Sequence, residues 1–143
     1  MTNFKLLFFT DDDRDDLQLL HEITHTLGHR AHLFTDGEAM FGELQSTNEK
    51  PHIIFLDISM PKADGFDIIE TIRSYTEYND IPIVIHSARC DTRCLDRAFE
   101  LGANYYMTKA YTYEGVKQSI ITAIETDWNT FKPKREEFLH KIS

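Results

Sequence analysis

Two kinds of hydrophobic pattern alternate along this chain. Short apolar runs are typical of strands in a parallel sheet buried on both faces, and such runs occur at residues 5–10, 30–34, 53–56, 81–86 and 104–108, the second of them weaker than the rest. Apolar residues at helical spacing predict helices at residues 13–27, 35–45, 65–75, 91–101 and 112–126. Strand and helix therefore alternate five times. This order predicts an α/β fold in which helices cover both faces of a doubly wound, five-stranded parallel sheet of order 2-1-3-4-5.

Turn and capping residues define several helix ends. Gly28 and Gly102 directly follow periodic segments and are placed to end them. Thr35 with Glu38 predicts a capping box for the second helix, and Thr112 is predicted to cap the fifth. The buried stripe of the first helix is predicted to consist of Leu17, Leu20, Thr24 and Leu27.

The last seventeen residues differ from the rest of the chain. They hold the only tryptophan, Trp128, and a breaker, Pro133, followed by a mixed-charge run. Apolar anchors in this segment are Phe131, Phe138, Leu139 and Ile142. The segment is too short for a separate effector domain, so we predict one domain over residues 1–126 and a C-terminal extension over 127–143. The extension would dock on its own domain or exchange with a partner.

Composition narrows the class of protein. With 41% hydrophobic and 27% charged residues, the 143-residue chain has the composition of a globular domain. A formal charge of −9 argues against DNA or other nucleic acid as a partner, because that binding requires Lys and Arg on phosphates. No apolar run approaches the roughly 18 residues of a membrane span, and the acidic N-terminal region does not fit a signal peptide. We therefore expect a cytoplasmic protein without membrane contact, with Cys90 and Cys94 as reduced thiols.

Acidic residues follow two of the predicted strands. Asp11 and Asp12 come after the first and Asp57 after the third, and strand order 2-1-3 places these strand ends side by side. Crowded carboxylates favour a bound cation, and their hard oxygen ligands suit Mg²⁺. The fourth and fifth strands would bring Ser87 and Lys109 to the same edge. A hydroxyl and an ammonium that face an acid and a divalent cation are the groups that phosphoryl transfer needs.

Together these residues resemble a bacterial response-regulator receiver domain, of the flavodoxin-like (βα)5 fold, over roughly residues 4–126. The motifs that carry the resemblance are Asp11-Asp12, Asp57 with Met60-Pro61 and Asp64-Gly65, Ser87-Ala88, and Gly102-Ala103 with Tyr106 and Lys109. The extension is more loosely similar to that of some stand-alone receivers, which favours a single-domain regulator or a phosphorelay intermediate.

The resemblance implies a role for each matching residue. Asp57 would accept a phosphoryl group from a phosphohistidine on a sensor histidine kinase or phosphotransfer protein. Mg²⁺ would be held by Asp12 directly, by Asp11 mostly through water, by Asp57, and by the backbone carbonyl of Ser59. In this interpretation the protein is a signalling phospho-acceptor and not a metabolic enzyme.

The resemblance also implies a switch. Ser87 would hydrogen-bond the phosphoryl group and Lys109 would pair with it, while Tyr106 would turn inward as Ser87 moves. The fourth helix, fifth strand and fifth helix should then change most. Tyrosines at 105, 106, 111 and 113 make this face aromatic, which suits a downstream protein target or a homodimer, although ordinary packing also explains them.

One position departs from the family pattern. The family usually has a proline in a cis bond after the lysine, and this chain has Ala110. A cis bond without proline costs roughly 2.5–4 kcal/mol, so the Lys109-Ala110 bond is expected to be trans or a strained cis. Ser59 and Arg89 stand where the family tunes dephosphorylation, which leaves the phosphoryl lifetime open.

Two other interpretations remain. His21-Glu22-Ile23-Thr24-His25 matches the HExxH pattern of zinc proteases. However, residue 31, where a third ligand would be required, is Ala31, and the helical phase turns both histidines toward solvent. The second interpretation is a degenerate receiver, which would bind partners without being phosphorylated. The departure from the family pattern at Ala110 leaves this interpretation open.

Overall fold

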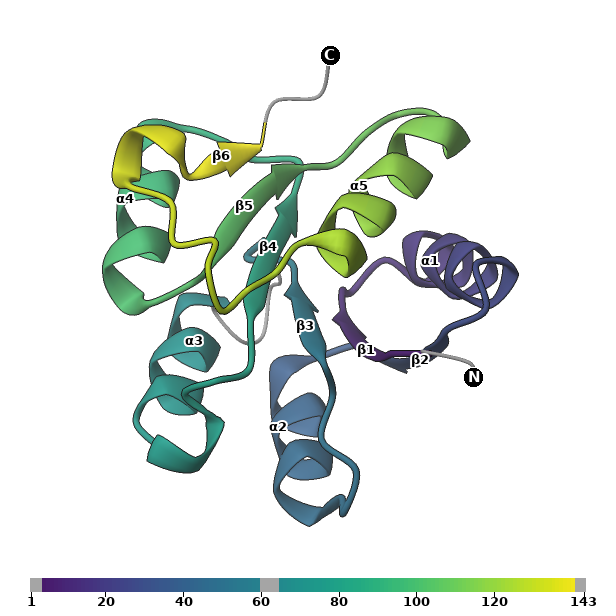
Figure 1. Cartoon of the computed structure of the whole chain (residues 1–143), viewed down its shortest axis with the longest axis horizontal. Helices are drawn as coiled ribbons and strands as arrows, with labels where there is room; N and C mark the ends of the chain where they lie inside the picture. Colours follow the sequence, from purple (N-terminus) through teal and green to yellow (C-terminus); the bar gives the residue numbers. More distant parts are fainter. Residues whose placement is uncertain (1–3, 60–64, 141–143) are drawn as a thin grey trace.

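Parallel strands form a single sheet in the order β2-β1-β3-β4-β5-β6 (Figure 1). The structure is a computed structural model that describes residues 4–59 and 65–140. The strands are β1 Leu6–Thr10, β2 Arg30–Phe34, β3 Ile53–Leu56, β4 Ile83–Ser87, β5 Tyr105–Thr108 and β6 Leu139–His140. The helices are α1 Arg14–Thr26, α2 Gly37–Ser46, α3 Gly65–Arg73, α4 Thr92–Leu101 and α5 Tyr113–Glu125. The predicted doubly wound α/β fold and the order of its first five strands are confirmed, but the prediction of five strands missed β6.

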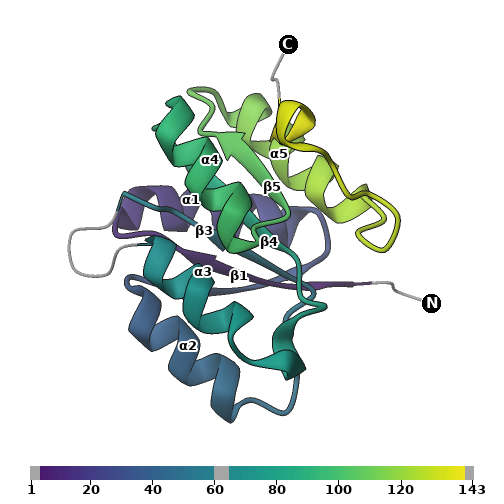
Figure 2. The ribbon, with the colours of Figure 1, turned by 90° about the vertical axis from the view of Figure 1, so that its left-hand side faces the viewer.

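Each central strand sends alternate side chains into two separate cores. Leu6 and Phe8 of β1 pack with α2, α3 and α4, whereas Leu7 and Phe9 pack with α1 and α5. Figure 1 shows α1 and α5 on one side of the strands, and Figure 2 shows α2 and α3 side by side on the other. Because β1, β3 and β4 are buried on both faces, they needed the unbroken apolar runs that identified them in the sequence.

The helix ends follow the predicted capping chemistry with one exception. Gly28 and Gly102 adopt left-handed backbone angles, with φ of 85° and 102°. Gly102 directly follows α4, and Gly28 follows α1 after the C-cap residue Leu27. Thr112 caps α5 by accepting a hydrogen bond from the Gly115 N–H. The predicted capping residue Thr35 is wrong by one position, because Asp36 caps α2 through the Ala39 N–H at 2.8 Å. A carboxylate is at least as good an acceptor there as a threonine hydroxyl.

The C-terminal segment packs against its own domain. Trp128 and Phe131 pack edge-on against Tyr105 of β5, with ring centroids 6.2 and 5.0 Å from that of the tyrosine. Phe138 is fully buried in the core that α4 covers, and β6 then pairs with β5. Ile142 lies outside the described residues. Residues 127–140 therefore dock in cis in this structure, while exchange with a partner stays a prediction.

Two further expectations concern the backbone and the membrane. No cis peptide bond occurs among the described residues, so the Lys109-Ala110 bond is trans. In the part of the chain that the structure covers, no helix has the length and apolar character needed to cross a bilayer.

Candidate functional site

Acidic residues meet at the carboxyl edge of the sheet. Asp11 follows β1 and Asp57 follows β3, and the two strands pair in register up to Thr10 and Leu56. Asp11 and Asp57 are buried while Asp12 is exposed. Carboxylate oxygens of Asp11, Asp12 and Asp57 all lie within 4.8 Å of one another. The sheet thus brings together the three acids that the sequence predicted as metal ligands.

Backbone groups orient the two buried carboxylates. The Asp13 N–H donates to Asp11 Oδ1 at 3.0 Å, and the Ser59 N–H donates to Asp57 Oδ1 at 2.8 Å. The Asp57 N–H itself donates to the Thr10 carbonyl at 3.0 Å, which ties β3 to β1 at the point where the acids emerge. One oxygen of each carboxylate is therefore fixed, and the other faces the centre of the site.

Lys109 provides the positive charge at this centre. Its Nζ lies 2.8 Å from Asp11 Oδ2 and 2.9 Å from Asp57 Oδ2. It also lies 2.8 Å from Asp16 Oδ2, in the first turn of α1. Asp16 was not predicted as a site residue, because an acid in the first turn of a helix is common there and favoured by the helix dipole. No pattern in the sequence distinguished it, because its contact with Lys109 depends on how α1 packs on the sheet.

Burial and these contacts change how the site titrates. Burial raises the pKa of Asp11 to about 6, although hydrogen bonds from Lys109 and the Asp13 N–H act in the opposite direction. For Lys109, burial alone would lower the pKa, but the hydrogen bonds that its ammonium donates to Asp11, Asp16 and Asp57 outweigh burial and raise the pKa. Lys109 therefore stays protonated. Because it is one positive charge among several carboxylates, the site as a whole carries a net negative charge.

Ser87 ends β4 next to this cluster. It is fully buried, and its Oγ lies 3.4 Å from the Oγ of Ser59 and accepts the Arg89 N–H at 3.2 Å. Its carbonyl accepts the Lys109 N–H at 2.9 Å, so the backbone links the serine to the lysine. Among the described residues, the Oγ of Ser59 is the hydroxyl that Ser87 can bond with, and either serine can be the donor.

The side chain of Tyr106 lies on the face of the sheet that α2, α3 and α4 cover. Its side chain is fully buried, its OH donates to the Arg89 carbonyl, and its ring packs on Phe138 with centroids 6.2 Å apart. The expected switch residue is thus already inside the protein. Its contact with the C-terminal segment was not expected from the sequence.

His86 is a second residue that the sequence analysis missed. It lies on β4 between the two cores, is 6% exposed, and shares a small internal space with Asp11 and Asp57. Its Nε2 has no hydrogen-bond partner among the described residues. Burial, and then the nearby Lys109 charge, lower the pKa of His86 to about 4, so the imidazole is neutral at pH 7.

Several other predicted positions lie apart from the site. His21, Glu22 and His25 are all exposed on α1. Within residues 4–59 and 65–140, the one group of three or more potential metal ligands is the Asp11, Asp12 and Asp57 cluster. Cys90 and Cys94 are free thiols. Met60, Pro61 and Asp64 lie outside the described residues.

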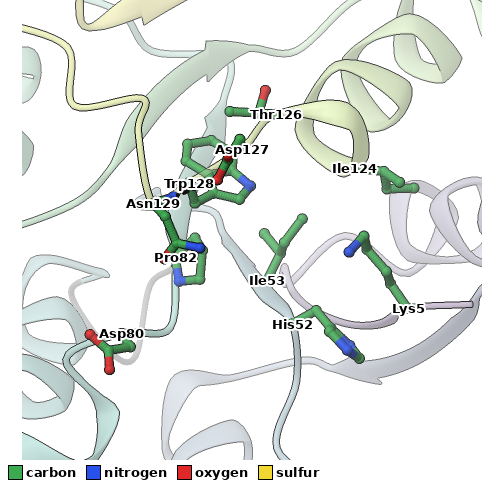
Figure 3. A pocket seen from close by; sticks show the side chains of 10 residues that line it. All are labelled: Lys5, His52, Ile53, Asp80, Pro82, Ile124, Thr126, Asp127, Trp128 and Asn129. Atoms are coloured by element: carbon green, nitrogen blue, oxygen red, sulfur yellow. Dashed lines mark hydrogen bonds between the residues drawn. The ribbon is translucent and has the colours of Figure 1, made fainter. Parts of the chain in front are cut away.

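A larger hollow lies at the opposite, amino edge of the sheet (Figure 3). It has a volume of about 300 Å³, and the residues that line it include Lys5, His52, Asp80, Asp127 and Trp128. The acidic cluster is not part of it.

A sequence model of the response regulator receiver domain matches residues 7–121, which cover most of the chain and all of the acidic cluster. The chain belongs to the receiver-domain family. It is therefore a receiver of the kind that serves response regulators in phosphorelay signalling.

Individual relatives agree with this assignment. The receiver is 27% identical to response regulator Rcp1 of Synechocystis over 131 residues, which cover 87% of this chain and 88% of that protein. It is 33% identical over 121 residues to the transcriptional regulatory protein KdpE of Staphylococcus aureus. That alignment covers 81% of this chain and 48% of KdpE, so the receiver spans about half of that relative.

Solved structures show the same fold. The phosphorylated cyanobacterial phytochrome response regulator RcpA has a TM-score of 0.77 at 26% identity, with 89% of this chain and 95% of that chain covered. Chemotaxis regulator CheY4 of Vibrio cholerae has a TM-score of 0.75 at 17% identity, with 85% and 99% covered. The second likeness supports the fold alone.

Proposed function

We propose that this receiver is phosphorylated on Asp57 by a histidine kinase or phosphotransfer protein, in a reaction that depends on Mg²⁺. The observation that carries the proposal is the Lys109 ammonium, which lies 2.8 and 2.9 Å from the buried carboxylates of Asp11 and Asp57. A buried acid beside an ammonium and further acids is an arrangement suited to phosphoryl transfer. The similarity to the phosphorylated regulator RcpA, at 26% identity, supports it further.

The acidic cluster fits a divalent cation. It offers three carboxylates whose oxygens, hard ligands for a cation, lie within 4.8 Å of one another. Lys109 forms ion pairs with Asp11 and Asp57, and the exposed carboxylate of Asp12 keeps its negative charge uncompensated by that lysine. Asp11, Asp12, Asp57 and the Ser59 carbonyl would hold Mg²⁺. When bound, the cation supplies positive charge against the phosphoryl oxygens.

The residues of the chain carry out the transfer as follows. An oxygen of the Asp57 carboxylate attacks phosphorus, an O–P bond forms, and the P–N bond to the donor imidazole breaks, so that the electron pair leaves with the nitrogen. The Ser59 N–H holds Asp57 in place at 2.8 Å. Lys109 pairs with the transferred group, and Ser87 turns its hydroxyl toward it. Since the phosphoryl group adds nearly two negative charges, these contacts strengthen during the reaction.

The output follows from where these residues sit. Ser87 and Lys109 belong to the ends of β4 and β5, so phosphorylation would alter the α4, β5 and α5 surface, which would contact a downstream protein or a second copy. The chemistry of the protein in this proposal is its own phosphorylation and slow hydrolysis, without a metabolic substrate.

Intact mass spectrometry after incubation with acetyl phosphate and Mg²⁺ tests the proposal. We expect one added phosphoryl group in the wild type and in Asp80→Asn, a control acid at the amino edge. We expect none in Asp57→Ala and none when Mg²⁺ is removed. An unmodified wild type would favour the degenerate receiver, and stoichiometric zinc in the purified protein would favour the protease. A modified Asp57→Ala would move the acceptor elsewhere.

A further inference from the structure

The hydrogen-bond donors of Lys109 all have carboxylate partners. An ammonium has three N–H groups, and its Nζ lies 2.8 Å from Asp11 Oδ2, 2.8 Å from Asp16 Oδ2 and 2.9 Å from Asp57 Oδ2. A phosphoryl group on Asp57 adds nearly two negative charges and strong acceptor oxygens. The contact with Asp57 is replaced by the reaction itself, because the group is bonded to that carboxylate. A second N–H for the group has to come from Asp11 or Asp16.

Burial decides which of these two contacts is released. The side chain of Asp11 is 3% exposed, whereas that of Asp16 is 39% exposed. A buried carboxylate that loses its counter-charge bears its full desolvation penalty, but water can replace the lysine at a partly exposed carboxylate. Lys109 therefore leaves Asp16 at a lower cost in free energy than it leaves Asp11.

The first turn of α1 holds Asp16 at the site. Asp13 caps this helix, and its Oδ1 accepts the Asp16 N–H at 3.2 Å. The Asp13 N–H donates in turn to Asp11 Oδ1 at 3.0 Å. The backbone that carries Asp16 is thus tied to the acidic cluster, so its carboxylate stays close to Lys109 when the ion pair opens.

The charge of Asp16 also opposes a phosphoryl group. Its Oδ2 and that of Asp57 contact the same ammonium nitrogen, which places the two oxygens at most about 6 Å apart, a distance at which like charges repel. Charge added at Asp57 is therefore less stable while Asp16 is ionised. Repulsion and the occupied N–H of Lys109 act in the same direction.

We propose that Asp16 is a positioning residue, which holds Lys109 in the unphosphorylated protein and competes with the phosphoryl group for its ammonium. This inference rests on the proposed function, because it requires a phosphoryl group at Asp57. Release of Lys109 from Asp16 accompanies the transfer, and no bond forms or breaks at Asp16 itself. Asp16 thereby slows phosphorylation. Since its ion pair is partly exposed, the effect amounts to about two- to fivefold.

The neighbouring acid provides a matched control. Asp15 and Asp16 both lie in the first turn of α1, and the N–H groups of both donate to the Asp13 cap. The ion pair with Lys109 belongs to Asp16, while Asp15 is exposed. Asp16→Asn and Asp15→Asn therefore remove the same charge and the same interaction with the helix dipole. They differ in the contact with Lys109.

Initial rates of phosphorylation by acetyl phosphate at saturating Mg²⁺, measured by intact mass, test the competition. At limiting acetyl phosphate we expect Asp16→Asn to react about two- to fivefold faster than the wild type, and Asp15→Asn to react at the wild-type rate. An unchanged or slower rate in Asp16→Asn, or an equal gain in Asp15→Asn, would overturn the role of Asp16 and leave the proposed function intact. A wild-type protein that is not modified at Asp57 would overturn both.

Nuclear magnetic resonance of the wild type tests the release of Lys109 directly, which a merely structural role of Asp16 would not produce. The carboxyl carbon resonance of Asp16 should shift when acetyl phosphate and Mg²⁺ are added, because the carboxylate exchanges the lysine for water. The resonance of Asp15 should stay in place. An Asp16 resonance that does not move while Asp57 becomes modified would show that Lys109 keeps this contact, and would overturn the competition.

Discussion

The two edges of the sheet use charge in opposite ways. At the carboxyl edge, Asp11 and Asp57 are buried, and the partly buried Lys109 forms an ion pair with each of them. At the amino edge, Asp80 and Asp127 are exposed around a hollow of about 300 Å³, where no such cluster forms among the described residues (Figure 3). The larger hollow is therefore not where the reactive groups gather. Buried charges in contact are the better indicator of function, since they shift pKa values and bind ions.

The amino edge instead uses its side chains for structure. His29 Nδ1 accepts the Lys5 N–H at 2.8 Å and His52 Nδ1 accepts the Leu6 N–H at 3.0 Å. These two bonds give acceptors to the first backbone N–H group of β1 and to that of the residue before it. Polar groups at this edge thus complete the hydrogen bonding of the fold, while those at the opposite edge leave charge available to a ligand.

The largest difference between the edges should appear on removal of a lysine. Lys109→Met leaves Asp11 and Asp57 buried without a counter-charge, so we expect a loss of about 3 kcal/mol in the free energy of unfolding at pH 8 without Mg²⁺. Lys5→Met at the amino edge should change it by less than about 0.5 kcal/mol. Urea unfolding measures both values, and equal losses would contradict the comparison.

The pH dependence of stability should reveal His86. Its pKa of about 4 in the folded protein lies below the ordinary value of 6.5, so the unfolded state binds the extra proton first. Stability from the neutral imidazole is complete above pH 6.5 and is lost as the pH falls toward 4, by up to about 3 kcal/mol.

Replacement of this histidine provides the control. Asp11, whose pKa is raised to about 6, titrates over part of the same range in both proteins. Urea unfolding of wild type and His86→Val at pH 7 and pH 4.5 should therefore show a steeper loss in the wild type. Parallel losses would mean that His86 does not titrate as its burial implies.

Mg²⁺ should stabilise only through the carboxyl edge. At about one hundred times its dissociation constant, a ligand of the folded state raises the free energy of unfolding by about 2.7 kcal/mol. Asp12→Asn should remove most of this gain and Asp127→Asn at the amino edge should keep it, as measured by urea unfolding with and without the ion. A gain that survives in Asp12→Asn would move the ion elsewhere.

A smaller effect is expected from a hydrogen bond at the amino edge. His29→Ala removes the acceptor of the Lys5 N–H, and a bond of this kind contributes about 1 kcal/mol. The stabilisation by Mg²⁺ and the phosphorylated mass should remain those of the wild type. A change in either would show that the two edges are energetically connected.

The sequence predicted those features that depend on long, repeated signals. Unbroken apolar runs such as Ile53–Leu56 marked the buried strands, and an acid directly after such a run must lie at the carboxyl edge. The placement of Asp11, Asp57 and Lys109 in one cluster followed from strand order alone. Their roles in phosphorylation stay predictions.

Features that depend on packing between distant residues escaped the sequence. Strand β6 is two residues long, too short for any period, and exists because Phe138 finds a site between α4 and β5. Asp16 reaches Lys109, 93 residues away, only through the angle at which α1 leaves the sheet. His86 sits in an apolar strand, where the sequence does not show whether its ring faces a core or a charged site.

Strand β6 also has a consequence for how copies of this protein meet in solution. Bare strand edges attract the edges of other sheets and promote aggregation. The edge at β2 carries exposed Arg30 and His32, which discourage such pairing, whereas the edge at β5 carries tyrosines and pairs with β6. We therefore expect the C-terminal segment to limit aggregation through the β5 edge. A chain shortened before Leu139 should lose solubility at high concentration before it loses its fold.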